Sequence, residues 1–135
     1  MKIVIIDGQG GRIGRMLVEG IKDRLDNHQL IAIGTNSLAT AAMIKAGASQ
    51  AATGENPVVF NSQDADLIVG PIGIVMANSM LGEVTEKMAV AISSSKAKKI
   101  LIPISKCNHI VVCINNQSLS VYIDQTIEEI LKLIA

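Results

Sequence analysis

The glycine-rich segment Gly8–Gly14 (GQGGRIG) contains the residues of this sequence best suited to binding chemistry. Two registers of a phosphate-binding glycine pattern overlap in it. Gly8 and Gly10 begin the G-x-G-x-x-G pattern, but its third position falls on Ile13, whereas the spacing of Gly8, Gly11 and Gly14 is complete. In such patterns the glycines allow a tight turn, a close approach of backbone to phosphate, and close packing of helix against strand.

The segments on either side determine what this turn can bind. Lys2–Asp7 is an apolar run that predicts a buried strand, and a helix is expected from Gly11 to about Asp26. A helix that begins in the turn offers free N–H groups and a partial positive charge to an anion. Arg12 could add a cation for a phosphate, and a solvated surface arginine is the alternative interpretation of this residue. We therefore predict that residues 8–14, including Gln9, bind a nucleotide or dinucleotide. The alternative is a turn that serves only packing.

The end of the second expected strand, residues 30–33, usually holds the acidic residue that binds the ribose of NAD. Here the residues are Thr35, Asn36 and Ser37, with no carboxylate. Their polar groups could bind a ribose phosphate, but no adjacent cation would pair with it, so NAD, NADP and a mononucleotide all stay open. As an alternative, these residues only form a turn, with Ser37 as the N-cap of a helix over Leu38–Ala46.

A second glycine-containing turn follows the strand expected at residues 67–69. Gly70, Pro71 and Gly73 should lie on the same edge of the sheet as the first turn, and complete the crevice. Asn78 and Glu83 are the nearest polar residues, and Glu83 is interpreted mainly as a helix-start residue. The segment 54–57 precedes an expected strand at 57–60, which places it at the opposite edge.

Other chemistries have weaker support. Ser93–Ser95 lack the context of a nucleophilic serine, and His28 lies in a polar turn. Cys107 and Cys113 match no zinc pattern, so no metal site is predicted, and a catalytic pair of Cys107 with His109 is a minor alternative.

Alternating apolar runs and helical periods predict an α/β fold, a single Rossmann-like three-layer domain over residues 1–135 with a mostly parallel sheet. Further strands are expected at 48–53, 100–102 and 109–114, and further helices at 86–98 and 121–134. The run 72–81 is too apolar to be exposed, so it is core or a subunit interface, and a homodimer is the modest preference.

The composition limits the partners. The formal net charge is zero and aromatic residues make up 1%, which argues against nucleic acid. The longest uncharged run, residues 67–82, is shorter than the ~20 residues of a membrane span. With no signal peptide at the start of the sequence, a cytoplasmic protein is expected.

Two resemblances add to these predictions. The run GQGGRIGR over residues 8–15 resembles the nucleotide loop of dihydrodipicolinate reductases, which implies a cofactor-binding geometry but not their reaction. Over its whole length the chain resembles a small bacterial family known only as a domain of unknown function. The matching stretches are residues 3–14, 34–39, 46–48, 53–56, 70–75, 82–83, 94–103 and 107–108.

Three hypotheses of function follow. The first is a nucleotide-binding module, with NAD or NADP among its ligands, that acts as a sensor or partner subunit. The second is a small NAD(P)-dependent oxidoreductase whose site is completed across a dimer, and the third is a structural oligomeric protein without a ligand.

Overall fold

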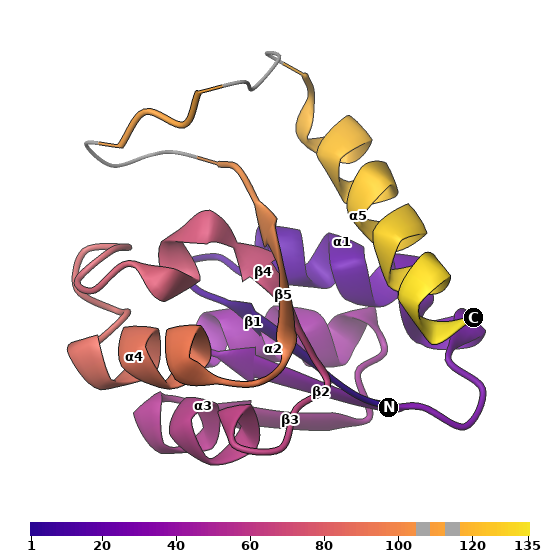
Figure 1. Ribbon diagram of the computed structural model, residues 1–135, viewed down its shortest axis with the longest axis horizontal. Helices are drawn as coiled ribbons and strands as arrows, with labels where there is room; N and C mark the ends of the chain where they lie inside the picture. Colours follow the sequence, from indigo (N-terminus) through magenta and orange to yellow (C-terminus); the bar gives the residue numbers. More distant parts are fainter. Residues whose placement is uncertain (105–108, 113–116) are drawn as a thin grey trace.

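The computed structural model describes residues 1–104, 109–112 and 117–135, and its centre is a five-stranded sheet (Figure 1). Every neighbouring pair of strands is parallel, in the order β3-β2-β1-β4-β5. The strands are β1 (Lys2–Asp7), β2 (Gln29–Gly34), β3 (Gln50–Thr53), β4 (Leu67–Pro71) and β5 (Lys98–Ile102). The α/β fold class predicted from the sequence is confirmed, with a sheet that is entirely parallel.

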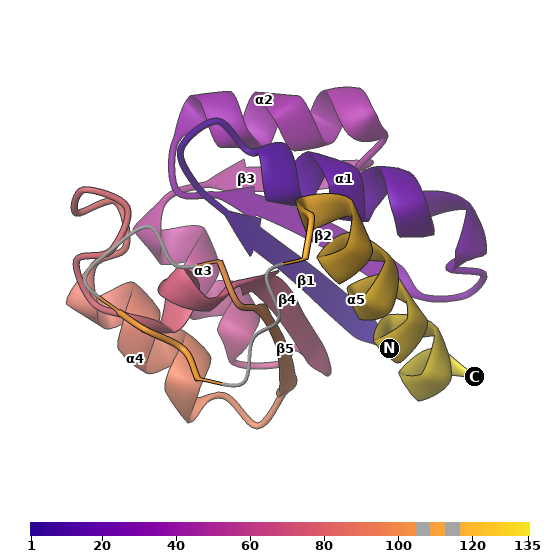
Figure 2. The same ribbon diagram turned by 90° about the horizontal axis from the view of Figure 1, so that it is seen from above.

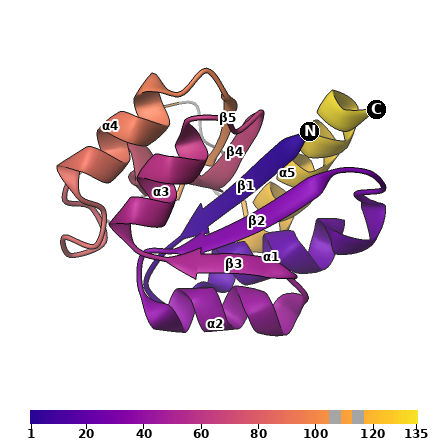
Figure 3. The same cartoon turned by 90° about the horizontal axis from the view of Figure 1, so that it is seen from below.

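Helices cover both faces of this sheet. One face carries α1 (Arg12–Ile21), α2 (Ser37–Ala46) and α5 (Leu119–Ile134), and Figure 2 shows α5 lying along α1. The other face carries α3 (Glu55–Ser62) and α4 (Glu86–Ser94), which lie side by side in Figure 3. The described residues also form two short 3₁₀ helices, η1 (Lys22–Arg24) and η2 (Ile72–Val75).

Residues 3–6 of β1 are all apolar, as expected for a strand with helices over both of its faces. Successive side chains of a strand point to opposite faces. Ile3 and Ile5 therefore pack among α1, α2 and α5, whereas Val4 and Ile6 pack among α3 and α4. This double burial fixes the end of β1, and with it the start of the glycine turn, in the middle of the molecule.

The strand expected at residues 57–60 is wrong, because these residues belong to α3. Val-Val-Phe has a high strand propensity, but a chain returning from β3 to the parallel strand β4 needs a crossover, normally a helix. Pro57 lies in the first turn of α3, where no N–H is needed. The sequence predicts residues 54–57 at the edge of the sheet opposite the glycine turn. This prediction is wrong for Gly54, which follows β3 directly and therefore lies at the carboxyl edge.

Other element boundaries also differ from the predictions. The first helix ends at Ile21 and continues as η1, and α4 ends at Ser94 because Lys98 already pairs in β5. The N-cap of α2 is Asn36, not Ser37: its side chain accepts the N–H of Ala39 at 2.9 Å. In the strand expected at 109–114, residues 109–112 form no strand, and residues 113 and 114 lie outside the described residues.

Candidate functional site

β1 and β4 are neighbours in the sheet, but the chain leaves them in opposite directions. After β1 it passes through α1 to β2, and after β4 it passes through η2 and α4 to β5 at the other edge. Ligands of open parallel sheets bind at such a switch point, outside the carboxyl ends of the strands. A pocket of about 300 Å³ lies at this place.

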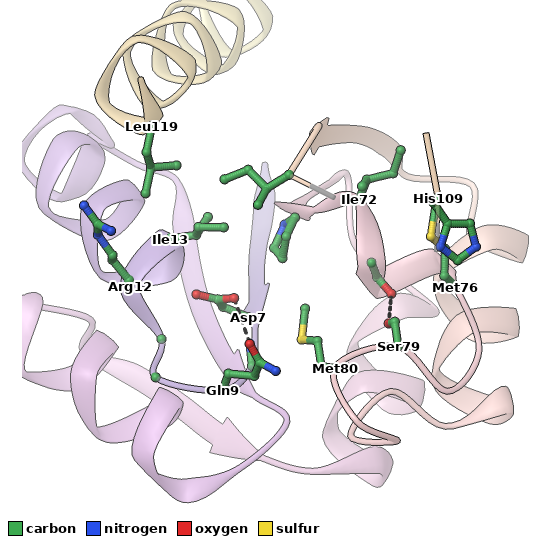
Figure 4. Close-up of a pocket in the computed structure, with 16 residues that line it drawn as sticks. Asp7, Gln9, Arg12, Ile13, Ile72, Met76, Ser79, Met80, His109 and Leu119 are labelled. Carbon is green, nitrogen blue, oxygen red and sulfur yellow. Dashed lines mark hydrogen bonds between the residues drawn. The ribbon is translucent and has the colours of Figure 1, made fainter. Parts of the chain in front are cut away.

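The pocket has two main walls (Figure 4). One wall is the end of β1 with the glycine turn, Asp7–Ile13, and the other is formed by residues of the segment that follows β4, including Gly73 and Ser79. Between them the lining is mostly apolar, which suits a flat heterocycle. The apolar side chains come from Ile13, Ile72, Met76, Met80, Ile104 and Leu119.

The glycines at positions 8, 11 and 14 are enclosed by protein atoms. A Cβ atom on Gly8 would lie 2.4 Å from Thr35 Oγ1, and one on Gly14 would lie 2.5 Å from Met43 Sδ. Gly11 has a left-handed φ of 73°, and a Cβ there would lie 2.7 Å from Ala39 Cα. These glycines allow the turn to pack against its neighbours, so the complete spacing found in the sequence has a structural cause.

Gly10 is different from the other glycines of the turn. It is exposed, its φ is not left-handed, and a Cβ atom there would have no heavy atom within 4 Å. Within the described part of the chain, the N–H groups of Gly10 and Arg12 have no acceptor, whereas the N–H of Gly11 donates to Gly8 O at 2.9 Å. Gly10 and Arg12 both line the pocket, so their N–H groups are available to a ligand.

The buried side chain of Asp7 accepts hydrogen bonds from both ends of the glycine turn. Its Oδ1 accepts the N–H of Gly8 at 2.8 Å and its Oδ2 accepts the N–H of Gly14 at 2.7 Å, with only 4% of the residue exposed. Burial raises the pKa of Asp7 above its ordinary value, more than the hydrogen bonds from the turn lower it, and the nearby charge of Glu83 raises it further. A carboxylate therefore already occupies part of the α1 N-terminus.

Glu83 joins three loops at the carboxyl edge of the sheet. Its Oε1 accepts the N–H of Gln9 at 2.9 Å, the hydroxyl of Thr35 at 2.7 Å and the amide of Asn36 at 2.7 Å. Burial raises the pKa of Glu83, but these three hydrogen bonds together lower it below its ordinary value. Glu83 thus places a carboxylate beside the end of β2, 48 positions after Thr35 in the sequence.

The family follows from comparison with known proteins. A family model described as "Domain of unknown function (DUF3842)" matches residues 2–135. The chain belongs to the DUF3842 family. A search among curated protein sequences gave no match for it.

The DUF3842 chain is similar in structure to a dodecameric FMN-dependent UbiX-like decarboxylase from Escherichia coli O157:H7, solved by crystallography. The TM-score is 0.55 at 11% sequence identity, and the match covers 99% of this chain and 94% of the other. At this identity the likeness shows a shared α/β fold.

Most of the residues that the sequence analysis assigned to the nucleotide-binding site lie together in the structure. Residues 8–13 line the pocket with Pro71 and Gly73, whereas Gly14 and Gly70 lie behind its walls. Thr35 and Asn36 reach the turn through Glu83 and do not line the pocket. Ser37 is exposed at the start of α2 and is not part of the pocket lining.

Several residues in or beside the pocket have roles that local sequence patterns do not indicate. The sequence predicts Asp7 only as the end of a strand and Glu83 mainly as a helix-start residue, whereas α4 begins at Glu86 with Thr85 as its N-cap. The run 72–81 is partly core, since Ile74 is buried, but Leu81 is 97% exposed. Asn78 shapes its own loop by donating its N–H to Val84 O at 2.7 Å. The other unforeseen lining residues are Ile72, Met76, Ser79, Met80, Ile104, His109 and Leu119.

Two further observations concern metals and membranes. Among residues 1–104, 109–112 and 117–135, no group of three His, Cys, Asp or Glu side chains gathers as a metal site would require. Cys107 lies outside these residues, so its pairing with His109 stays a prediction. None of the helices in the described part of the chain is long and apolar enough to cross a membrane.

Proposed function

We propose that this protein binds a nucleotide in the pocket between β1 and β4. The observation that carries the proposal is that Gly10 and Arg12, whose N–H groups have no acceptor within the described residues, both line a pocket at the switch point of the sheet. Such N–H groups at a helix N-terminus suit a phosphate oxygen. The apolar lining beyond them suits the heterocycle of the same ligand.

Charge limits the strength of the phosphate site. Asp7 already accepts two N–H groups of the turn, and Glu83 accepts a third from Gln9, so two carboxylates lie close to the phosphate position. Arg12 lines the pocket and is exposed, so its guanidinium can offset this repulsion. We expect moderate affinity that falls with ionic strength.

Size and charge also favour some nucleotides over others. A pocket of about 300 Å³ is at the small end of the range for ligand sites, which favours a mononucleotide, or one half of a dinucleotide. An FMN-dependent decarboxylase shares the fold, so FMN is a suitable first probe. Among dinucleotides we expect NAD over NADP, because Glu83 beside Thr35 would repel a 2′-phosphate.

The test is a direct binding measurement. The purified protein is titrated with FMN, AMP, NADH and NADPH, and binding is followed by flavin or nicotinamide fluorescence and by calorimetry. We expect saturable binding of at least one of FMN, AMP and NADH, weaker binding of NADPH than of NADH, and loss of affinity as salt is raised. An absence of heat and fluorescence change with all four ligands at millimolar concentration would refute the proposal.

A further inference from the structure

Gln9 has an unusual backbone conformation for its residue type. Its φ is 49°, in the left-handed region that glycine tolerates and that L-residues with a long side chain rarely adopt. Four glycines stand in the same segment, Gly8–Gly14, yet this left-handed position carries a glutamine. Non-glycine residues held in this region tend to occur at functional sites.

Two polar side chains hold Gln9 in this conformation. Glu83 Oε1 accepts its N–H at 2.9 Å, and Asn36 Nδ2 donates to its carbonyl oxygen at 2.9 Å. Asn36 is itself fixed, because its Oδ1 caps α2 and its amide also donates to Glu83. Both backbone groups of Gln9 are therefore occupied by rigid neighbours.

The side chain of Gln9 is left free for a ligand. It lines the pocket, and Figure 4 shows its amide extending between Asp7 and Met80. Within the described residues this amide makes no hydrogen bond. An amide both donates and accepts, so it can pair with any heterocycle edge that has a donor beside an acceptor, as glutamine pairs with adenine.

We propose that Gln9 is the residue of this pocket that recognises the heterocycle of the nucleotide, and that Glu83 and Asn36 are its positioning residues. The inference rests on the proposed nucleotide site and adds the chemical group that is recognised. Edges of this kind occur in the imide of a flavin and in the amino and ring nitrogens of adenine. The phosphate is bound elsewhere in the pocket, by Gly10 and Arg12.

Two substitutions of Gln9 distinguish a loss of nucleotide recognition from a loss of folding stability. Gln9→Gly removes the amide and relieves the left-handed conformation, so its Tm should be unchanged or up to about 4 °C higher. Gln9→Met keeps the length of the side chain without its polar atoms. Asn27→Gly is the matched control, because Asn27 also has a left-handed φ of 64° but lies in the turn before β2.

The probes are FMN, AMP and ribose 5-phosphate, which has no heterocycle. We expect Gln9→Gly and Gln9→Met to bind the better of FMN and AMP about tenfold to a hundredfold more weakly, the effect of losing the two hydrogen bonds of the amide, while Asn27→Gly binds as the wild type does. Binding of ribose 5-phosphate should be the same in all four proteins. A loss with FMN but not AMP, or the reverse, identifies the heterocycle.

Glu83 is tested through Gln9 in a double-mutant cycle. Glu83→Ala removes both the support of Gln9 and a negative charge near the phosphate, so its effect on nucleotide binding should be unfavourable in the wild-type background but neutral or favourable in the Gln9→Gly background. An equal loss in both backgrounds would show that Glu83 does not act through Gln9. If the wild type binds FMN or AMP and Gln9→Gly binds them equally well, the inference fails while the proposed function stands. If the wild type binds neither, both fail.

Discussion

Gly10 and Gly11 are adjacent in the turn, and we expect an added methyl group to have opposite consequences at the two positions. In Gly11→Ala the new Cβ lies 2.7 Å from Ala39 Cα and 3.0 Å from Ala39 O, both backbone atoms of α2. The left-handed φ of 73° costs a further ~1–2 kcal/mol, and overpacking costs ~1–3 kcal/mol. The free energy of unfolding should therefore fall by about 2–5 kcal/mol, which for a chain of 135 residues lowers Tm by roughly 7–18 °C.

In Gly10→Ala the methyl group meets no heavy atom within 4 Å and the backbone needs no left-handed φ. Stability should stay within about 0.5 kcal/mol of the wild type, or rise slightly because alanine restricts the unfolded chain. Thermal and urea unfolding followed by circular dichroism measure both variants. Equal stability of the two variants, or a destabilised Gly10→Ala, would refute the packing roles assigned to these glycines.

Three further substitutions test the polar groups around the turn. Glu83→Gln should lower the free energy of unfolding by about 1–2 kcal/mol at neutral pH. Because the pKa of Glu83 is lowered in the fold, its contribution is present above the unfolded pKa of about 4.3 and is lost as the pH falls, so wild type and variant should converge in acid urea titrations. Asp7 has the opposite sign: its pKa is raised mainly by burial, so its contribution is present below about pH 3.9 and is lost as the pH rises. The wild type should therefore lose stability relative to Asp7→Asn as the pH rises above about 3.9, and a flat difference would contradict this. Asn36→Ala removes the cap of α2 and the hydrogen bond to Gln9 O, and should cost about 1–3 kcal/mol in urea denaturation; a loss below about 0.5 kcal/mol would contradict the roles of both bonds.

The central strands could be predicted because uninterrupted runs of apolar residues indicate strands that are buried on both faces. Lys2–Asp7 and residues 67–69 are apolar without alternation, as strands covered on both faces must be. The glycine turn between a strand and a helix was equally visible. Local sequence patterns were therefore sufficient to predict the pocket wall formed by the continuous segment Asp7–Ile13.

The errors arose where tertiary contacts decide. In α3, the crossover to a parallel strand outweighs the strand propensity of Val58 and Phe60, and Pro57 in the first helical turn was the signal that could have corrected the prediction. Glu83 contacts residues 47, 48 and 74 positions away, with no local pattern to mark it. The contacts of Asp7 and Glu83 with the glycine turn could therefore be seen only in the folded structure.

The central claim is that the free N–H groups of the glycine turn bind the phosphate of a nucleotide. Its most direct test is a ¹H–¹⁵N NMR titration of the labelled protein with FMN and AMP, with Gly10→Ala as the variant. We expect saturable shifts of the Gly10 and Arg12 amide signals in the wild type, and a weaker shift of the Arg12 signal in the variant, because the methyl group added to this pocket-lining residue would occupy space that the phosphate needs. A titration that leaves both signals unmoved at millimolar nucleotide, or moves only signals far from the β1–β4 pocket, would contradict the claim.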